Sequence, residues 1–186
     1  MKVILRSYAL SDRTGLIRAI NAVCGEGLWM STSRFEPTPA WEHALADPNC
    51  GCHLLLLAVG TNAPVGWCRV FREPDVQGTV ASLGIGLLPI YRDRGIGTQM
   101  AQKALAWAWS ADVERVVLRT RRDNHRAVRV FSRCGFYVTD EAGEGWVEMA
   151  CDPPALRAGR SNASIGLERV LRLPVVSVAD RERTWL

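Results

Sequence analysis

The residues best suited to chemistry form a turn around two glycines, the run Arg-Asp-Arg-Gly-Ile-Gly-Thr at positions 92–98. A hydrophobic run over residues 80–88 ends just before the turn, and an apolar stretch with helical spacing, residues 96–109, begins within it. The first N–H groups of a helix have no partner inside the helix and lie at the positive end of its dipole, and glycine lets an anion approach the backbone closely. The pattern predicts a phosphate-binding turn, although glycines alone would also suit a tight turn that binds nothing.

A second pattern lies downstream of this turn. Asn124 precedes a stretch with helical spacing that ends at Cys134, and Gly135 and Phe136 follow. Asparagine is favoured as the N-cap of a helix and glycine just after its last turn, so we expect a helix over residues 124–134. From spacing alone, Asn124 is a helix cap, a ligand contact or both.

The elements that must position these residues follow from hydrophobic periodicity and turn residues. We expect strands over residues 3–8, 53–59, 65–72, 80–88, 115–120, 136–139 and 146–151. We expect helices after the caps Ser11 or Asp12 and Thr38, from the glycine turn to about Ser110, and over residues 124–134. The resulting order, β, α, α, β, β, β, α, β, α, β, β, predicts an α/β (α+β) fold with an antiparallel centre.

Length and composition indicate one domain. The chain has 186 residues, of which 48% are hydrophobic, enough for a single core. We assign residues 1–151 to this domain. Residues 152–186 are rich in Pro, Gly, Ser and Arg, and we expect them to form a C-terminal extension with a short helix over residues 165–173.

Charge and hydropathy restrict the partners. The net charge of +4 suits an anionic small ligand and does not require nucleic acid. No stretch approaches the roughly 20 apolar residues of a membrane-spanning helix, and charges interrupt the start of the chain too early for a secretory signal. We therefore expect a cytoplasmic protein with no membrane and no nucleic acid partner, and we leave a homodimer open.

The six cysteines are scattered through apolar segments of a full-sized domain, so we expect reduced thiols. Cys50, Cys52 and His53 offer two sulfurs and one imidazole within one turn. No second Cys or His pair accompanies them at the spacing of a zinc site, and we therefore expect no metal.

The two patterns together resemble the GNAT superfamily of acyl-CoA-dependent N-acyltransferases. The family's phosphate signature is Gln or Arg, two residues, Gly, one residue, and Gly or Ala, and Arg92, Gly95 and Gly97 match it. The family's second feature, a strand followed by an Asn-led helix that ends in Gly-Phe, is matched from Asn124 to Phe136. The resemblance covers roughly residues 3 to 150 and is best over residues 80–136.

The resemblance implies a GNAT fold, in which the fourth and fifth strands of a sheet of about seven strands splay apart and helices cover both faces. It implies acetyl-CoA as co-substrate, with the pantetheine arm in the gap between these strands and the pyrophosphate on the backbone of residues 93–98. The cofactor-binding residues that it implies are Leu87, Leu88, Arg92, Asp93, Arg94, Gly95, Ile96, Gly97, Thr98, Asn124 and Phe131.

Two catalytic positions depart from the family. Many members carry a general base Glu on the fourth strand where this chain has Ser82, and a general acid Tyr in the last helix where it has Phe131. The substitutes that we consider for proton transfer are Ser82 itself, Ser132 and Cys134. Residues 25–32 resemble the segment that covers the acceptor pocket in the family. In this segment and just after it, the candidate substrate-binding residues are Glu26, Trp29 and Glu36. Glu26 and Glu36 are also candidates for proton transfer, which they would carry out through water.

We therefore expect an N-acetyltransferase that moves an acetyl group from acetyl-CoA to a primary amine of a small molecule or amino acid by direct attack, without a metal. Two alternatives remain. One is acetylation of a protein N-terminus or lysine. The other is an acyl-CoA-binding module without catalysis, which the pair Ser82 and Phe131 favours.

Overall fold

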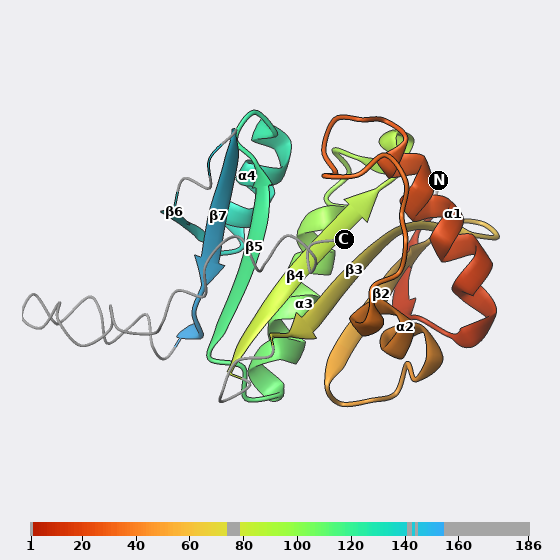
Figure 1. Cartoon of the computed structure of the whole chain (residues 1–186), viewed down its shortest axis with the longest axis horizontal. Helices are drawn as coiled ribbons and strands as arrows, with labels where there is room; N and C mark the ends of the chain where they lie inside the picture. The colour runs from red at the N-terminus through yellow and green to blue at the C-terminus, as the bar shows by residue number, and fades with distance from the viewer. Residues whose placement is uncertain (1, 74–78, 141–142, 144, 155–186) are drawn as a thin grey trace, which may run out of the picture.

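A computed structural model describes residues 2–73, 79–140, 143 and 145–154, which form one mixed sheet with helices on both faces (Figure 1). The sheet has seven strands in the order β1-β2-β3-β4-β5-β7-β6. The strands are β1 Ile4–Ser7, β2 His53–Val59, β3 Pro64–Arg72, β4 Val80–Leu87, β5 Arg115–Arg121, β6 Tyr137–Asp140 and β7 Trp146–Cys151. The helices are α1 Arg13–Cys24, α2 Pro39–Ala46, α3 Ile96–Ser110 and α4 His125–Arg133, with short 3-10 turns η1 Leu10–Asp12 and η2 Pro89–Tyr91. The predicted order of elements is confirmed.

The two faces of the sheet carry separate cores because side chains alternate along a strand. In β3, Cys68 and Val70 pack into the core that contains α3, whereas Trp67 and Phe71 pack into the core that contains α1 and α2. The predicted arrangement, with helices on both faces, is confirmed.

The sheet divides between β4 and β5. These strands pair in parallel at only three positions, from Val80 with Arg115 to Ser82 with Val117, although both continue beyond them. Figure 1 shows β5, β7 and α4 diverging from β4 beyond this point. The N–H of Leu88 donates to the carbonyl of Val65 at 2.9 Å, so by the alternation of an antiparallel ladder the backbone groups of Ile85 and Leu87 face the gap.

The start of α1 differs from the prediction in its cap. Asp12 occupies the N-cap position, but its side chain makes no cap hydrogen bond. Instead, its carboxylate accepts two hydrogen bonds from the Arg6 guanidinium, at 2.6 and 2.8 Å, and one from the Ala9 N–H at 2.9 Å. The prediction for Thr38 is confirmed, because its side chain accepts from the N–H of Trp41 at the start of α2.

The expectation of six reduced cysteines is wrong for one pair. Cys50 and Cys52 form a disulfide, with their Cα atoms 5.3 Å apart, because a turn with only Gly51 between them brings both side chains to the same place. The other four cysteines, Cys24, Cys68, Cys134 and Cys151, form no disulfide.

The described residues contain no helix with both the length and the apolar character needed to cross a membrane. The expected C-terminal extension lies almost wholly outside the described residues, as does the short helix expected over residues 165–173.

Candidate functional site

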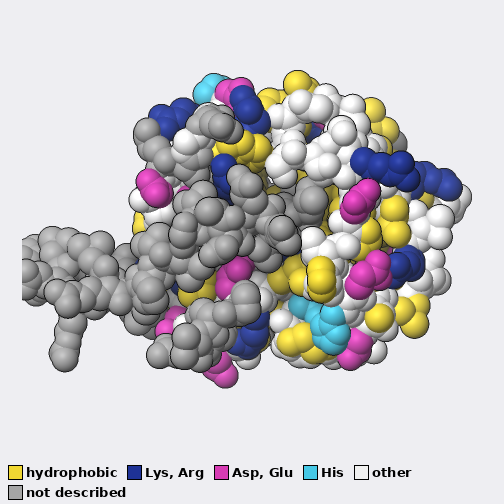
Figure 2. All heavy atoms as spheres, viewed as in Figure 1, with side chains coloured by type: hydrophobic (Ala, Val, Ile, Leu, Met, Phe, Trp, Pro, Cys, Tyr) yellow, Lys and Arg dark blue, Asp and Glu magenta, His cyan; other side chains and the backbone are white. Residues whose placement is uncertain are grey.

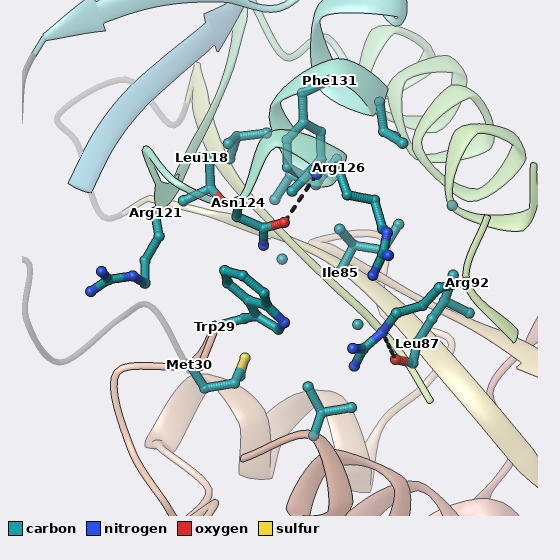
Figure 3. A pocket seen from close by; sticks show the side chains of 18 of the residues that line it. Trp29, Met30, Ile85, Leu87, Arg92, Leu118, Arg121, Asn124, Arg126 and Phe131 are labelled. Carbon is teal, nitrogen blue, oxygen red and sulfur yellow. Dashed lines mark hydrogen bonds between the residues drawn. The ribbon is translucent and has the colours of Figure 1, made fainter. Parts of the chain in front are cut away.

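A cleft of about 1180 Å³ occupies the gap between β4 and β5 (Figure 3). Its walls come from the segment after α1, from β3 and β4, from the glycine turn, and from β5 and α4. Eight of the residues predicted to bind the cofactor line it, namely Leu87, Arg92, Asp93, Gly95, Gly97, Thr98, Asn124 and Phe131. Three others do not: Leu88 is half-buried, Arg94 is exposed, and Ile96, the first residue of α3, is buried in the core.

The glycine turn leaves open space beside the first backbone groups of α3. Gly95 is the N-cap of α3 and has φ of +75°, a left-handed conformation that L side chains rarely adopt. A Cβ atom there would meet nothing within 4 Å, and one at Gly97 would meet only Leu87 Cδ1, at 3.6 Å. The turn therefore combines the unpaired N–H groups of a helix start with room for an anion.

Arginines dominate the charged lining of the cleft, and three of them are ion-paired: Arg92 with Glu26, Arg121 with Asp123 and Arg126 with Asp93. Seven arginines line it and the only acidic residue in its described lining is Asp93. The Asp93 carboxylate lies 2.9 Å from Arg126 Nε, and both side chains are more than half exposed. The arginines are Arg69, Arg92, Arg119, Arg121, Arg126, Arg129 and Arg133. A polyanion would be attracted to this gap from solution.

Asn124 caps α4 and lines the cleft at once. Its Oδ1 accepts from the N–H of Ala127 at 3.2 Å, so its amide nitrogen is directed toward the cleft and Trp29 (Figure 3). Phe131, 4% exposed, lines the same gap and packs edge-on against Phe136 with 5.6 Å between ring centres. Asn124 therefore both caps α4 and lines the cleft.

The comparison with known proteins now decides the family. The model of the acetyltransferase (GNAT) family matches residues 17–136. The chain belongs to this family. No curated protein matches the sequence.

Solved GNAT structures share the fold at low sequence identity. An acetyltransferase of this family from Streptococcus pneumoniae has a TM-score of 0.71 and 18% identity, over 82% of this chain and 100% of its own. A putative acetyltransferase from Salmonella typhimurium, solved with its cofactor acetyl-CoA, has a TM-score of 0.70 and 12% identity, over 82% and 94%. A ribosomal-protein-alanine N-acetyltransferase from Brucella melitensis has a TM-score of 0.69 and 15% identity, over 81% and 99%.

None of the three side chains considered for direct proton transfer lines the cleft of this GNAT protein. Ser82 is fully buried at the last position where β4 and β5 pair, and its Oγ accepts from Arg69 Nη1 at 3.1 Å. Ser132 is exposed on α4. The Cys134 thiol lies 3.9 Å from the Thr98 carbonyl, and burial raises its pKa.

The acceptor side of the cleft is mainly apolar. Trp29 and Met30 follow α1 and line the cleft together with Trp67 of β3, and Met30 packs against the core cluster that contains Trp67. Figure 3 shows the Trp29 ring in the cleft between Met30 and Asn124. Of the candidate substrate-binding residues, Trp29 therefore lines the cleft, whereas Glu36 is exposed and Glu26 is not in the lining.

Arg69 is a charged cleft residue that the sequence analysis missed. It is 1% exposed, its guanidinium lies 4.7 Å from the ring centre of Phe71, and burial lowers its pKa to about 10. A Cβ atom at Gly84 would lie 3.1 Å from Arg69 Nε, so glycine there leaves room for the guanidinium. The available signal was one charged residue inside the apolar run PVGWCRVFR of β3.

Proposed function

We propose that this protein is an acetyl-CoA-dependent N-acetyltransferase that acylates a primary amine of a small molecule, with amino acids as the first class to test. The observation that carries the proposal is the combination, in one gap of the sheet, of an open glycine turn at a helix start with a lining of seven arginines and one aspartate. Acetyl-CoA matches this combination, because it carries a pyrophosphate that suits the helix start and a sugar phosphate that suits the arginines.

Acetyl-CoA fits the cleft with its polar end at the turn and its thioester near the middle of the sheet. The N–H groups of residues 93–98 and the Thr98 hydroxyl would bind the pyrophosphate. The arginines of β5 and α4 that line the cleft, such as Arg129, would meet the 3′-phosphate. The pantetheine arm would then follow β4. Ile85 turns its backbone groups to the gap, and so does Leu87, whose carbonyl accepts from Arg92 Nε and whose N–H is left for the arm. The N–H of Leu88 is bonded to Val65 instead.

The reaction would occur between the apolar walls formed by Phe131 and Trp29. The neutral amine attacks the thioester carbonyl, a tetrahedral oxyanion forms against a backbone N–H of β4, and the C–S bond breaks to release the CoA thiolate. The amine loses a proton and the thiolate gains one. Because the only carboxylate in the described lining is that of Asp93, beside Arg126, we assign both transfers to water.

The charge of the cleft favours an acceptor that carries a carboxylate. Of the seven arginines, Arg69 on β3 is the one beside the acceptor side, so an amino acid would bring an anion toward it, whereas a polyamine would bring further positive charge. A protein N-terminus is the second candidate, because a ribosomal-protein-alanine acetyltransferase has a similar fold. A catalytically inactive acyl-CoA-binding module is the third.

The test measures CoA thiol release from acetyl-CoA with a panel of amino acids, an amino-terminal peptide and polyamines, and identifies the acetylated product by mass. We expect release that depends on an amino acid and a product heavier by one acetyl group. Turnover only with the peptide would move the acceptor class to protein N-termini. CoA binding without release across the whole panel would contradict the enzyme and favour the binding module.

A further inference from the structure

The turn between α2 and β2 brings four metal-ligating side chains together. His43 comes from the last turn of α2, Cys50 and Cys52 come from the turn, and His53 is the first residue of β2. One ligand atom from each residue lies within 4.8 Å of those of the other three. The sequence analysis weighed three of these residues and missed His43, because seven positions of the chain separate it from Cys50 and only the fold returns the end of α2 to the turn.

Two of the distances match those around a single zinc ion. Cys52 Sγ lies 3.4 Å from His43 Nε2 and 3.4 Å from His53 Nδ1. With Zn–S of about 2.3 Å and Zn–N of about 2.0–2.1 Å in tetrahedral geometry, a ligating sulfur and nitrogen lie about 3.6 Å apart. The two imidazoles are therefore already at the separation from this sulfur that a shared zinc ion imposes.

We propose that, when Cys50 and Cys52 are reduced, these two residues bind one Zn²⁺ ion together with His43 and His53. Two thiolates and two imidazoles form a common donor set of closed, structural zinc sites. Such a site would tie the C-terminal end of α2 to the beginning of β2.

The disulfide and the zinc site are alternative states of the same residues. A dithiol reductant breaks the S–S bond by exchange, so that Cys50 and Cys52 gain two electrons and two protons while the reductant becomes a disulfide. Zinc then displaces the two thiol protons to water and binds the thiolates. Reduction breaks the S–S bond and lets the two sulfurs move apart. They must do so to bind zinc, because two thiolates on one tetrahedral zinc ion lie about 3.8 Å from each other.

Exposure and burial both suit such a site. His43 is exposed and the two cysteines are half-buried, so an ion can reach them from solution. Figure 2 shows histidine side chains (cyan) at the surface on the lower part of the same view, where Figure 1 has α2. His53 is 5% exposed, and its Nε2 has no hydrogen bond partner among the described residues. Its Nδ1 is the nitrogen that lies beside Cys52 Sγ, at 3.4 Å, so this buried ring already presents a ligand atom to the site.

The site lies at the end of the sheet opposite the glycine turn (Figure 1), but it is connected to the cleft through aromatic contacts. The His53 ring packs edge-on against Phe71, with 6.1 Å between ring centres. The Arg69 guanidinium lies over the same Phe71 ring, 4.7 Å from its centre, and Arg69 lines the cleft. Zinc would therefore stabilise the position of His53 and, through it, the Phe71 ring that Arg69 packs against. This role is structural and involves no acetyl transfer.

The experiment uses the full chain, reduced with excess dithiol, freed of metal and titrated with Zn²⁺, and in parallel with Co²⁺ as a spectroscopic probe. We expect one zinc per chain and a cobalt spectrum with thiolate-to-metal charge transfer and the intense d–d bands of a tetrahedral site. We also expect zinc to raise the Tm of the reduced protein and a chelator to reverse the increase.

The variants His43→Ala and Cys50→Ser test the ligands without disturbing the core, because His43 is exposed and Cys50 is half-buried. Each should weaken zinc binding by about two orders of magnitude or more, since a closed site loses one of four ligands. The control is His125→Ala, which removes an exposed histidine of α4 and should leave zinc binding unchanged.

Three results would overturn the proposal. They are fully reduced protein that binds no zinc, a Cys50–Cys52 disulfide that persists in excess dithiol, and zinc binding that the His43→Ala variant retains in full. Thiol titration of the same samples separates the first result from the second. These measurements do not depend on acetyl transfer, so their outcome is independent of the proposed enzyme activity.

Discussion

The guanidinium of Arg92 binds both carboxylate oxygens of Glu26, at 2.8 and 2.5 Å, across 66 positions of the chain. Its Nε also donates to the carbonyl of Leu87 at 2.8 Å (Figure 3). The two charged side chains are only 14% and 17% exposed. Arg92 thus joins the segment that carries Trp29 to the phosphate turn, and its charge is already paired beside the cleft.

We predict that Glu26→Gln loosens the acceptor side of the cleft. A buried charge that loses its partner is costly, so we expect a loss of about 1–3 kcal/mol in the free energy of unfolding and a higher KM for the acceptor. The KM for acetyl-CoA should change less or fall, because Arg92 becomes available to an anion. Urea unfolding and steady-state kinetics measure these effects.

The matched control is Glu42→Gln, which breaks the exposed pair with Arg13. The side chains of Arg13 and Glu42 are 43% and 52% exposed, and exposed ion pairs contribute little to stability. Equal effects of the two substitutions on the acceptor KM would contradict the clamp between the Trp29 segment and the phosphate turn.

Gly97→Glu should abolish CoA binding while the fold survives. The position is open, with only Leu87 Cδ1 within 4 Å of a Cβ, so the substitution places a carboxylate against the proposed pyrophosphate without a clash. We expect CoA affinity to fall by at least about a hundredfold, measured by calorimetry. Gln99→Glu adds the same charge at an exposed position of α3 outside the cleft lining, and it should bind CoA normally. Undiminished binding by Gly97→Glu would remove the pyrophosphate from this turn.

Ser82→Ala should cost stability more than catalysis. Ser82 is buried and accepts a hydrogen bond from Arg69. It stands at the position where many family members carry the general base, but it does not line the cleft. We expect about 1–3 kcal/mol less stability, because Arg69 loses a buried acceptor, and a kcat within a few-fold of the wild type. A loss of kcat by several orders of magnitude with unchanged stability would instead identify Ser82 as a proton carrier.

Asp12 gives a pH prediction with a definite sign. Its pKa is lowered from the ordinary value of 3.8, chiefly by the hydrogen bonds from Arg6, although burial opposes the shift. A carboxyl with a lowered pKa in the folded state stabilises the fold above pH of about 4 and loses that contribution as the pH falls. In Asp12→Asn the decline in stability between pH 5 and 2, followed by urea unfolding, should therefore be shallower than in the wild type. An unchanged decline would contradict this assignment.

The sequence predicted the fold better than the site, and the reason is physical. Hydrophobic periodicity and caps such as Thr38 are local, so strands such as His53–Val59 were predicted with their observed bounds. Glycine motifs are also local, and Gly95 and Gly97 lie where they were expected. The pairing of Glu26 with Arg92, the burial of Arg69 and the approach of His43 to Cys52 depend on contacts between distant segments, which no spacing in the sequence encodes.

The pH dependence of the reaction tests how the proton leaves the amine. The described lining of the cleft contains no His, Glu, Cys or Tyr, and its Asp93 is paired with Arg126. If no side chain of the enzyme takes the proton, only the neutral fraction of the acceptor reacts. The value of kcat/KM for the acceptor should then rise tenfold per pH unit and level off near the pKa of the acceptor amine itself. Two acceptors whose amine pKa values differ by about 1 should give profiles displaced by the same amount. Profiles that share one inflection, whatever the acceptor, would require an ionising group on the enzyme and would contradict proton transfer to water.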